Sequence, residues 1–103
     1  MKFLLMGRTR EHVQPHVQQR AIAKFVNWPP PKEAKVDPIL VSADNDLVFI
    51  IAETTNLEPL YEAVVQHSEC LKWQVFPVFE ATRSAPIALR ALEWSVNHGE
   101  PKY

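Results

Sequence analysis

The chain has 103 residues, enough for one domain with a hydrophobic core and too few for a multidomain enzyme. Hydrophobic residues make up 47% and charged residues 22%, and the net charge of −1 argues against a basic nucleic-acid surface or an acidic tail. The single cysteine, Cys70, excludes an internal disulfide and a redox Cys-x-x-Cys pair, so it favours a reducing, cytoplasmic setting. No segment is long and apolar enough to predict a membrane span or a secretory signal.

The first predicted element is a strand over residues 3–8. Phe3 and Leu5 point to one face of this strand, and Leu4 and Met6 point to the other. A strand that is apolar on both faces must be covered on both faces. In a chain this short, helices suffice for one face only.

A helical stretch follows and reaches about Asn27. Pro15 favours a helix start at that position, because proline is tolerated as the first helical residue. The inward stripe of this helix consists of Val17, Ala21, Ile22 and Phe25.

The helix ends at Trp28-Pro-Pro-Pro31, since consecutive prolines hold an extended conformation. Residues 29–38 are therefore predicted to form a stiff connector. Strands are predicted over residues 39–43 and 47–53, joined as a hairpin by the turn at residues 44–46.

A second helix is predicted after Asn56, whose side chain can cap it. Its apolar stripe consists of Leu60, Val64, His67 and Leu71. A last strand is predicted over residues 72–80, and Pro77 places that strand at a sheet edge or a bulge. A third helix is predicted from a Ser84 cap to about Gly99. Its inward side chains are predicted to be Ile87, Ala88, Ala91 and Trp94.

The order of elements predicts an α+β fold of the ferredoxin-like βαββαβ plan with an extra C-terminal helix. The single domain, residues 1–103, divides into a core of residues 1–81 and a C-terminal helix and tail of residues 82–103. The first and third strands are expected at the centre of the sheet. The helix-free sheet face would exceed the apolar patch that a monomer usually exposes, which predicts a homodimer. Periodicity leaves open whether the interface set is Leu4, Met6 and Ile50, or Phe3, Leu5 and Ile51.

Three successive elements carry a resemblance to a known superfamily. They are Trp28-Pro-Pro, the hairpin ending Ile50-Ile-Ala-Glu53, and the helix that leads from His67 into the strand ending Val75-Phe-Pro-Val78. This pattern resembles that of small dimeric α/β-barrel proteins, and the likeness covers residues 1 to about 81. The sequence is most similar to an uncharacterised branch with Trp-x-Pro-Pro and Val-x-Pro-Val elements. The superfamily includes cofactor-free monooxygenases, haem enzymes, muconolactone isomerase and regulatory ligand-binding domains, so the resemblance implies a fold and leaves the activity open.

Two side chains are the candidates for catalysis. His67 lies on an inward helical stripe, where an imidazole could act as acid, base or haem ligand, and Glu53 ends an otherwise apolar strand. We expect both to line one pocket, with Arg8 as a charge partner. For each residue a structural role is the more frequent alternative: a hydrogen-bonded histidine at a helix end, or a carboxylate that reaches solvent.

The other candidate residues give weaker signals. His12 and His16 have the i, i+4 spacing of a metal-binding helix face, but Pro15 disturbs that geometry and a surface pair is the favoured interpretation. Trp28 and Trp73 could stack on an aromatic ligand, although packing is the more frequent role of such residues. With only two glycines, the chain has no phosphate-binding loop.

The sequence therefore predicts a homodimer of unknown activity that binds a small apolar or aromatic molecule between sheet and helices. The alternatives are a non-catalytic ligand-sensing or assembly module, and a cofactor-independent isomerase or monooxygenase or a haem enzyme. Whether the chain is an enzyme stays open. No cofactor is predicted from the residues, and haem stays open through the superfamily. An RNA-binding role is the weakest alternative, because the basic Gly-Phe-rich signature of such modules is absent.

Overall fold

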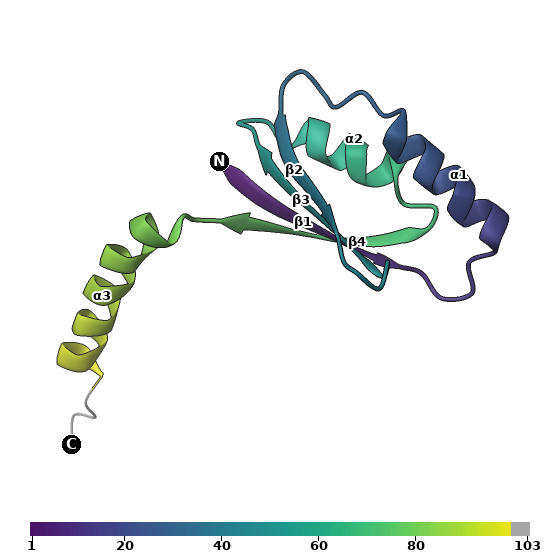
Figure 1. Ribbon diagram of the computed structural model, residues 1–103. Helices are drawn as coiled ribbons and strands as arrows, with labels where there is room; N and C mark the ends of the chain where they lie inside the picture. Colours follow the sequence, from purple (N-terminus) through teal and green to yellow (C-terminus); the bar gives the residue numbers. More distant parts are fainter. Residues whose placement is uncertain (100–103) are drawn as a thin grey trace.

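The computed structural model describes residues 1–99 as a mixed α+β fold, with one four-stranded sheet and three helices (Figure 1). The strands are β1 (Lys2–Thr9), β2 (Lys35–Val41), β3 (Leu47–Glu53) and β4 (Leu71–Val78). The helices are α1 (Pro15–Val26), α2 (Glu58–Gln66) and α3 (Ala81–His98). Among the described residues, no helix is long and apolar enough to cross a membrane.

The strand order is β2-β3-β1-β4, and every neighbouring pair is antiparallel. The prediction that the first and third strands are central is confirmed. Pro77 lies on the edge strand β4, where a missing backbone donor is tolerated.

The helix boundaries follow local sequence signals closely. α1 begins at Pro15, as predicted, and its preceding residue Gln14 is extended. α2 has Leu57 at its N-cap, but the side chain of Asn56 still accepts a hydrogen bond from the backbone N–H of Glu58 at 3.0 Å. α3 begins at Ala81, three residues before the predicted cap at Ser84, and includes Pro86.

The connector after α1 is shorter than predicted, because β2 already begins at Lys35. Lys35 and Val36 pair with the end of β3, and the register shifts between Val36 and Ile39. The irregularity contains Pro38, so the proline occupies an edge position where the ladder is already interrupted. The buried Thr54 hydroxyl holds the connector to the sheet by donating to the Glu33 carbonyl at 3.0 Å.

The hydrophobic core lies between the sheet and α2. Phe3 and Leu5 of β1, Ile50 and Ala52 of β3, and Leu60 of α2 form one buried cluster. The pairing of Leu5 with Ile50 places these two on the same face. The two alternative interface sets each combined residues from opposite faces, and the register corrects this: Ile50 belongs with Phe3 and Leu5, and Ile51 belongs with Leu4.

The other sheet face carries apolar side chains that no helix covers. Figure 1 shows α1 and α2 together on one side of the sheet, while α3 hangs from the end of β4 on the other side. We call the uncovered surface the open face. Its apolar residues, paired in register, are Leu4, Met6, Leu40, Leu47, Phe49, Ile51, Phe76 and Val78.

The third helix departs from its predicted packing. None of its residues is buried, and Trp94 of the predicted inward stripe is 63% exposed. The reason is geometric: α3 leaves the sheet at the end of β4 and points away from it (Figure 1).

Candidate functional site

Four aromatic rings meet where α1, α2 and β4 come together. The His67 imidazole stacks on Phe25, with ring centroids 4.2 Å apart and an interplanar angle of 14°. The edge of Trp28 approaches His67 at 4.8 Å, and Trp73 lies 6.3 Å from Phe25. Residues from a helix end, a proline connector, a second helix end and a strand thus form one cluster, which holds the connector against the core.

His67 is buried and lacks a hydrogen-bond partner for its Nε2 atom within the described part of the chain. Its side chain is only 7% exposed. Burial lowers the pKa of His67 below its usual value, and the positive charge of Lys24 lowers it further. The imidazole is therefore neutral at physiological pH.

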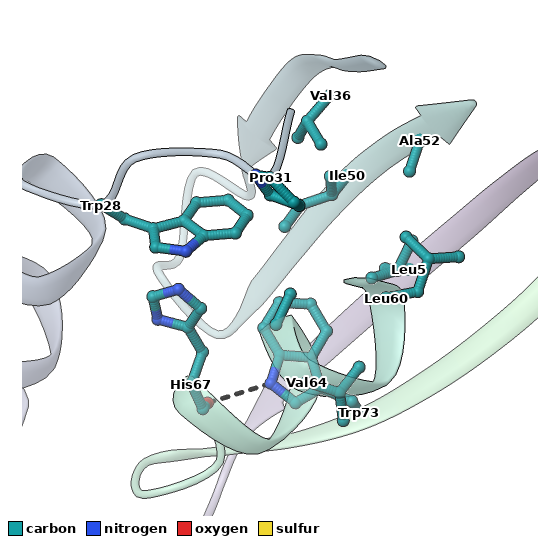
Figure 2. Close-up of a pocket in the computed structure, with 11 residues that line it drawn as sticks. Leu5, Trp28, Pro31, Val36, Ile50, Ala52, Leu60, Val64, His67 and Trp73 are labelled. Carbon is teal, nitrogen blue, oxygen red and sulfur yellow. Dashed lines mark hydrogen bonds between the residues drawn. The ribbon is translucent and has the colours of Figure 1, made fainter. Parts of the chain in front are cut away.

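The indole N–H groups of both tryptophans are used within the fold. Trp73 Nε1 donates to the carbonyl oxygen of His67 at 2.9 Å, and Trp28 Nε1 donates to the side-chain oxygen of Gln66 at 3.2 Å. Figure 2 shows the first of these bonds and the Trp28 indole beside the imidazole. The structure thus places Trp28 and Trp73 in a packing arrangement around His67.

The space beside His67 is a small apolar cavity of about 10 Å³. Figure 2 shows its lining, which includes Leu5, Pro31, Ile50, Leu60 and Trp73. Such a volume holds the centre of one water molecule at most. A haem does not fit beside His67 in this arrangement.

Glu53 and Arg8 lie apart from His67 and from each other. Glu53 shares the open face with Ile51, on the side of the sheet opposite the core cluster, and it pairs in register with Lys2 and Lys35. Arg8 is at the other end of β1, opposite Leu47. The structure therefore does not bring together the expected acid–base pocket of His67, Glu53 and Arg8.

His12 and His16 do not share a helix face. α1 begins at Pro15, and His12 precedes it with a left-handed φ of 61°. Both side chains are exposed. Within residues 1–99, no group of three His, Cys, Asp or Glu side chains is arranged to hold a metal ion.

A larger groove lies between α1 and the helix-facing side of β2 and β3, with a volume of about 380 Å³. Its lining is mostly apolar: Ala21, Ile22, Phe25, Val26, Ile39, Val41, Val48 and Leu71. The remaining lining residues are Thr9, Gln18, Asn45 and Cys70. None of these side chains carries a charge at neutral pH, so the groove suits an uncharged apolar molecule.

Sequence reasoning missed this groove, although a signal for it exists. Ile22 and Val26 are 56% and 78% exposed on α1, and Ile39 and Val41 are 43% and 56% exposed on β2. Ile22 lies on the predicted inward stripe of α1, and Val26 continues that stripe by one turn. Because these apolar residues extend beyond what the core covers, they mark a surface that is available for contact.

Ion pairs fix the position of α1 beside the groove. The Glu69 carboxylate, in the loop before β4, pairs with Arg20, and it accepts from Lys24 at 3.1 Å. Hydrogen bonds from Arg20 and Lys24 lower the pKa of Glu69. Burial raises the pKa of the neighbouring Cys70 thiol, whose Sγ lies 3.4 Å from the Val17 carbonyl, so this thiol is protonated and unreactive.

Comparison with known proteins identifies one matching family. The model of a domain of unknown function, DUF3303, matches residues 1–92. The match extends past residue 81, where the resemblance seen in the sequence ends, and into α3. Neither the curated proteins nor the solved structures contain a match to the chain.

Proposed function

We propose that this chain, which belongs to the DUF3303 family of domains of unknown function, binds a small, uncharged, apolar or aromatic molecule in the groove between α1 and the sheet. The observation that carries the proposal is the groove itself: about 380 Å³ with eight apolar lining residues and no charged one. Small-molecule sites usually enclose about 300–1,000 Å³ and combine apolar walls with a few polar groups.

The polar residues of the groove support an orienting role. Thr9 is the last residue of β1, Asn45 lies in the turn between β2 and β3, and Gln18 belongs to α1. The Thr9 hydroxyl already donates to the Asp46 carbonyl at 3.2 Å, so it can accept from a ligand hydroxyl group. The amide groups of Gln18 and Asn45 can donate to or accept from a hydroxyl or carbonyl group of the ligand. A ligand with a charged group would lose its hydration without gaining a partner of opposite charge there.

We further propose that the protein acts as a homodimer of ferredoxin-like protomers that pack through their open faces. The strand order with α1 and α2 on one side of the sheet supports the split βαβ plan. Apolar residues on the open face, including Phe49 and Ile51, support burial against a second copy.

A non-catalytic binding module is favoured over an enzyme by the placement of the titratable groups. His67 is neutral and enclosed by aromatic rings, and Glu53 lies across the sheet from it. The groove lining offers no carboxylate or imidazole that could transfer a proton. Binding, rather than turnover, is what this lining supports.

An uncharged fluorescent probe tests the groove. We expect N-phenyl-1-naphthylamine to bind the protein saturably, with an increase in its emission. Ala21→Trp places an indole in the groove and should weaken binding about tenfold or more. Ala23→Trp adds the same side chain to an exposed position of α1 outside the groove and should leave binding unchanged. Equal binding by the Ala21→Trp variant and the unaltered protein would contradict the proposal.

A further inference from the structure

α3 is a helix without a packing partner in the described chain. It has 18 residues, none of them buried, and its large apolar side chains are 47–74% exposed. It makes the molecule 64 Å long, with a radius of gyration of 18.6 Å. A compact chain of this length has a radius of gyration of about 13 Å.

The apolar residues of α3 form two adjacent seams, each with the 4-3-4 spacing of packed helices. One seam is Ile87, Ala91 and Trp94, followed by His98; the other is Ala85, Leu89, Leu92 and Val96. At 100° per residue the centres of the two seams lie about 160° apart on the helix circumference, and the strip between them holds only alanines and serines: Ala81, Ser84, Ala88 and Ser95. Together they form an arc of roughly 200°, and Pro86 and polar residues occupy the opposite side. An apolar arc this wide fits contact with more than one neighbouring surface.

Such a helix is not expected to persist alone in water. Pro86 lies in the interior of α3, where it removes a backbone hydrogen bond and leaves only residues 87–98 beyond it. Isolated helices shorter than about 12–15 residues are marginal in water even with favourable sequences. Tertiary or intermolecular packing of the apolar seams is the usual source of stability for such a helix.

The open face and α3 are contiguous unpartnered surfaces. Figure 1 shows that α3 descends on the side of the sheet opposite α1 and α2, so the two surfaces form an L. A hollow of about 520 Å³ lies in the angle of the L, between Lys2, Glu53 and Arg83. The angle is held by the ion pair of Lys2 with Glu80 at 2.6 Å and by Arg83 over the Phe79 ring at 5.8 Å.

The size of the open face gives α3 a role in assembly. With strands about 4.8 Å apart and residues about 3.3 Å apart, the open face covers only about 450 Å². Two such faces bury under ~1,000 Å², whereas stable interfaces bury roughly 1,200–2,000 Å². Two α3 helices, each about 27 Å by 10 Å, raise the total to on the order of 1,500 Å².

We propose that α3 is an arm that each protomer lays on a second copy of this chain, completing the interface formed by the open faces. The inference rests on the homodimer proposed above and adds the element that makes it stable. One two-fold axis through the open faces brings each L against the other, because α3 projects on the same side as the open face. Both seams are then covered, one by the partner's sheet and the other by the partner's α3.

The charges on α3 favour a protein partner over a lipid surface. Its polar side carries Arg83, Arg90 and Glu93, a net charge of only one positive unit. Helices that lie in membrane interfaces have polar faces rich in lysine and arginine. A second copy of the chain also offers what the seams require, an uncovered apolar face.

Paired double variants of the full chain test the arm by sedimentation equilibrium. Leu92→Gln with Trp94→Gln removes one large side chain from each seam and should weaken the dimer about tenfold or more. Arg90→Gln with Glu93→Gln changes the polar side by the same number of residues and should leave the dimer intact. Hydrogen exchange of α3 amides in the unaltered protein should be slow in the dimer and fast after dilution.

The possible outcomes distinguish the proposal that α3 is an arm from the proposal that the open faces form a dimer. A dimer that the seam variant does not weaken, with α3 amides unprotected, would overturn the arm and leave the open-face dimer standing. A chain that is monomeric at every concentration would overturn the dimer of the proposed function and the arm with it. Binding of α3 to vesicles containing phosphatidylserine, with no effect of the seam variant on the dimer, would also overturn the arm.

Discussion

The imidazole of His67 stacks on the ring of Phe25, with centroids 4.2 Å apart, although the two residues are 42 positions apart in the chain. Phe25 belongs to α1 and also lines the groove, whereas His67 ends α2 and lines the small cavity. The stack therefore connects the candidate ligand groove with the packed centre of the molecule. A substitution of either ring should therefore alter the packing of both the groove and the small cavity.

The stability of the protein should decrease as the pH falls below about 6.5, because the pKa of folded His67 lies under its value in the unfolded chain. In the window between the two pKa values the unfolded state binds more protons, so unfolding becomes easier by up to about 1.4 kcal/mol per pH unit. Below the folded pKa the effect of this residue levels off. Urea melts at a series of pH values measure it.

His67→Leu removes the titrating group and should flatten this part of the pH profile. His16→Gln changes an exposed histidine outside the aromatic cluster and serves as the control. An unchanged pH profile in the His67→Leu variant would show that other groups cause the loss of stability.

Trp28→Ala should destabilise the fold by about 2–3 kcal/mol, less than the roughly 3–5 kcal/mol of a fully buried tryptophan. The reason for the reduction is that Trp28 is only half-buried, although its ring packs on both Phe25 and His67. Denaturant melts give the value. A loss below about 0.5 kcal/mol would mean that the connector does not depend on this contact.

Gly7→Ala should destabilise the protein by about 1–3 kcal/mol, because a Cβ at this position meets the Trp73 ring at 3.0 Å. The same Gly7→Ala substitution is also made in a Trp73→Leu variant, which lacks the ring. There the added methyl group should lower the free energy of unfolding by less. A double-mutant cycle measures the coupling. Equal costs in the two backgrounds would refute the steric explanation.

Ile51→Lys should convert the dimer to a folded monomer, since it places an ammonium group in the proposed open-face interface. Circular dichroism checks that the fold persists, and sedimentation velocity reports the mass. Ala23→Lys adds the same charge to the exposed side of α1 and should remain dimeric. Dimers of equal stability in both variants would place the interface elsewhere.

The central part of the fold was predictable because its signals are local. The apolar runs of β1 and β3, the helix start at Pro15 and the edge position of Pro77 each depend on a residue and its immediate neighbours. β2 was predicted too short, because prolines disfavour a strand by propensity. Pairing of Lys35 with Glu53 overrides that preference, and the register shift accommodates Pro38.

The candidate site was less predictable because it depends on register and on empty space. A one-residue change of register moves a side chain to the other face of the sheet. Periodicity alone therefore does not show that Glu53 lies on the face opposite His67, or that Ile50 shares a face with Leu5. The groove arises from the distance between α1 and β2, which no local pattern encodes. Its trace in the sequence is the excess of apolar residues on α1.

Amide chemical shifts test most directly whether the ligand binds in the groove between α1 and the sheet. The ¹⁵N-labelled full chain is titrated with N-phenyl-1-naphthylamine, and the shift of every backbone amide is followed. We predict saturable shifts that are largest around the groove, at residues such as Ala21, Ile22, Val41 and Leu71. Shifts confined to the open face or to α3, or no saturable shift in the groove, would contradict the account.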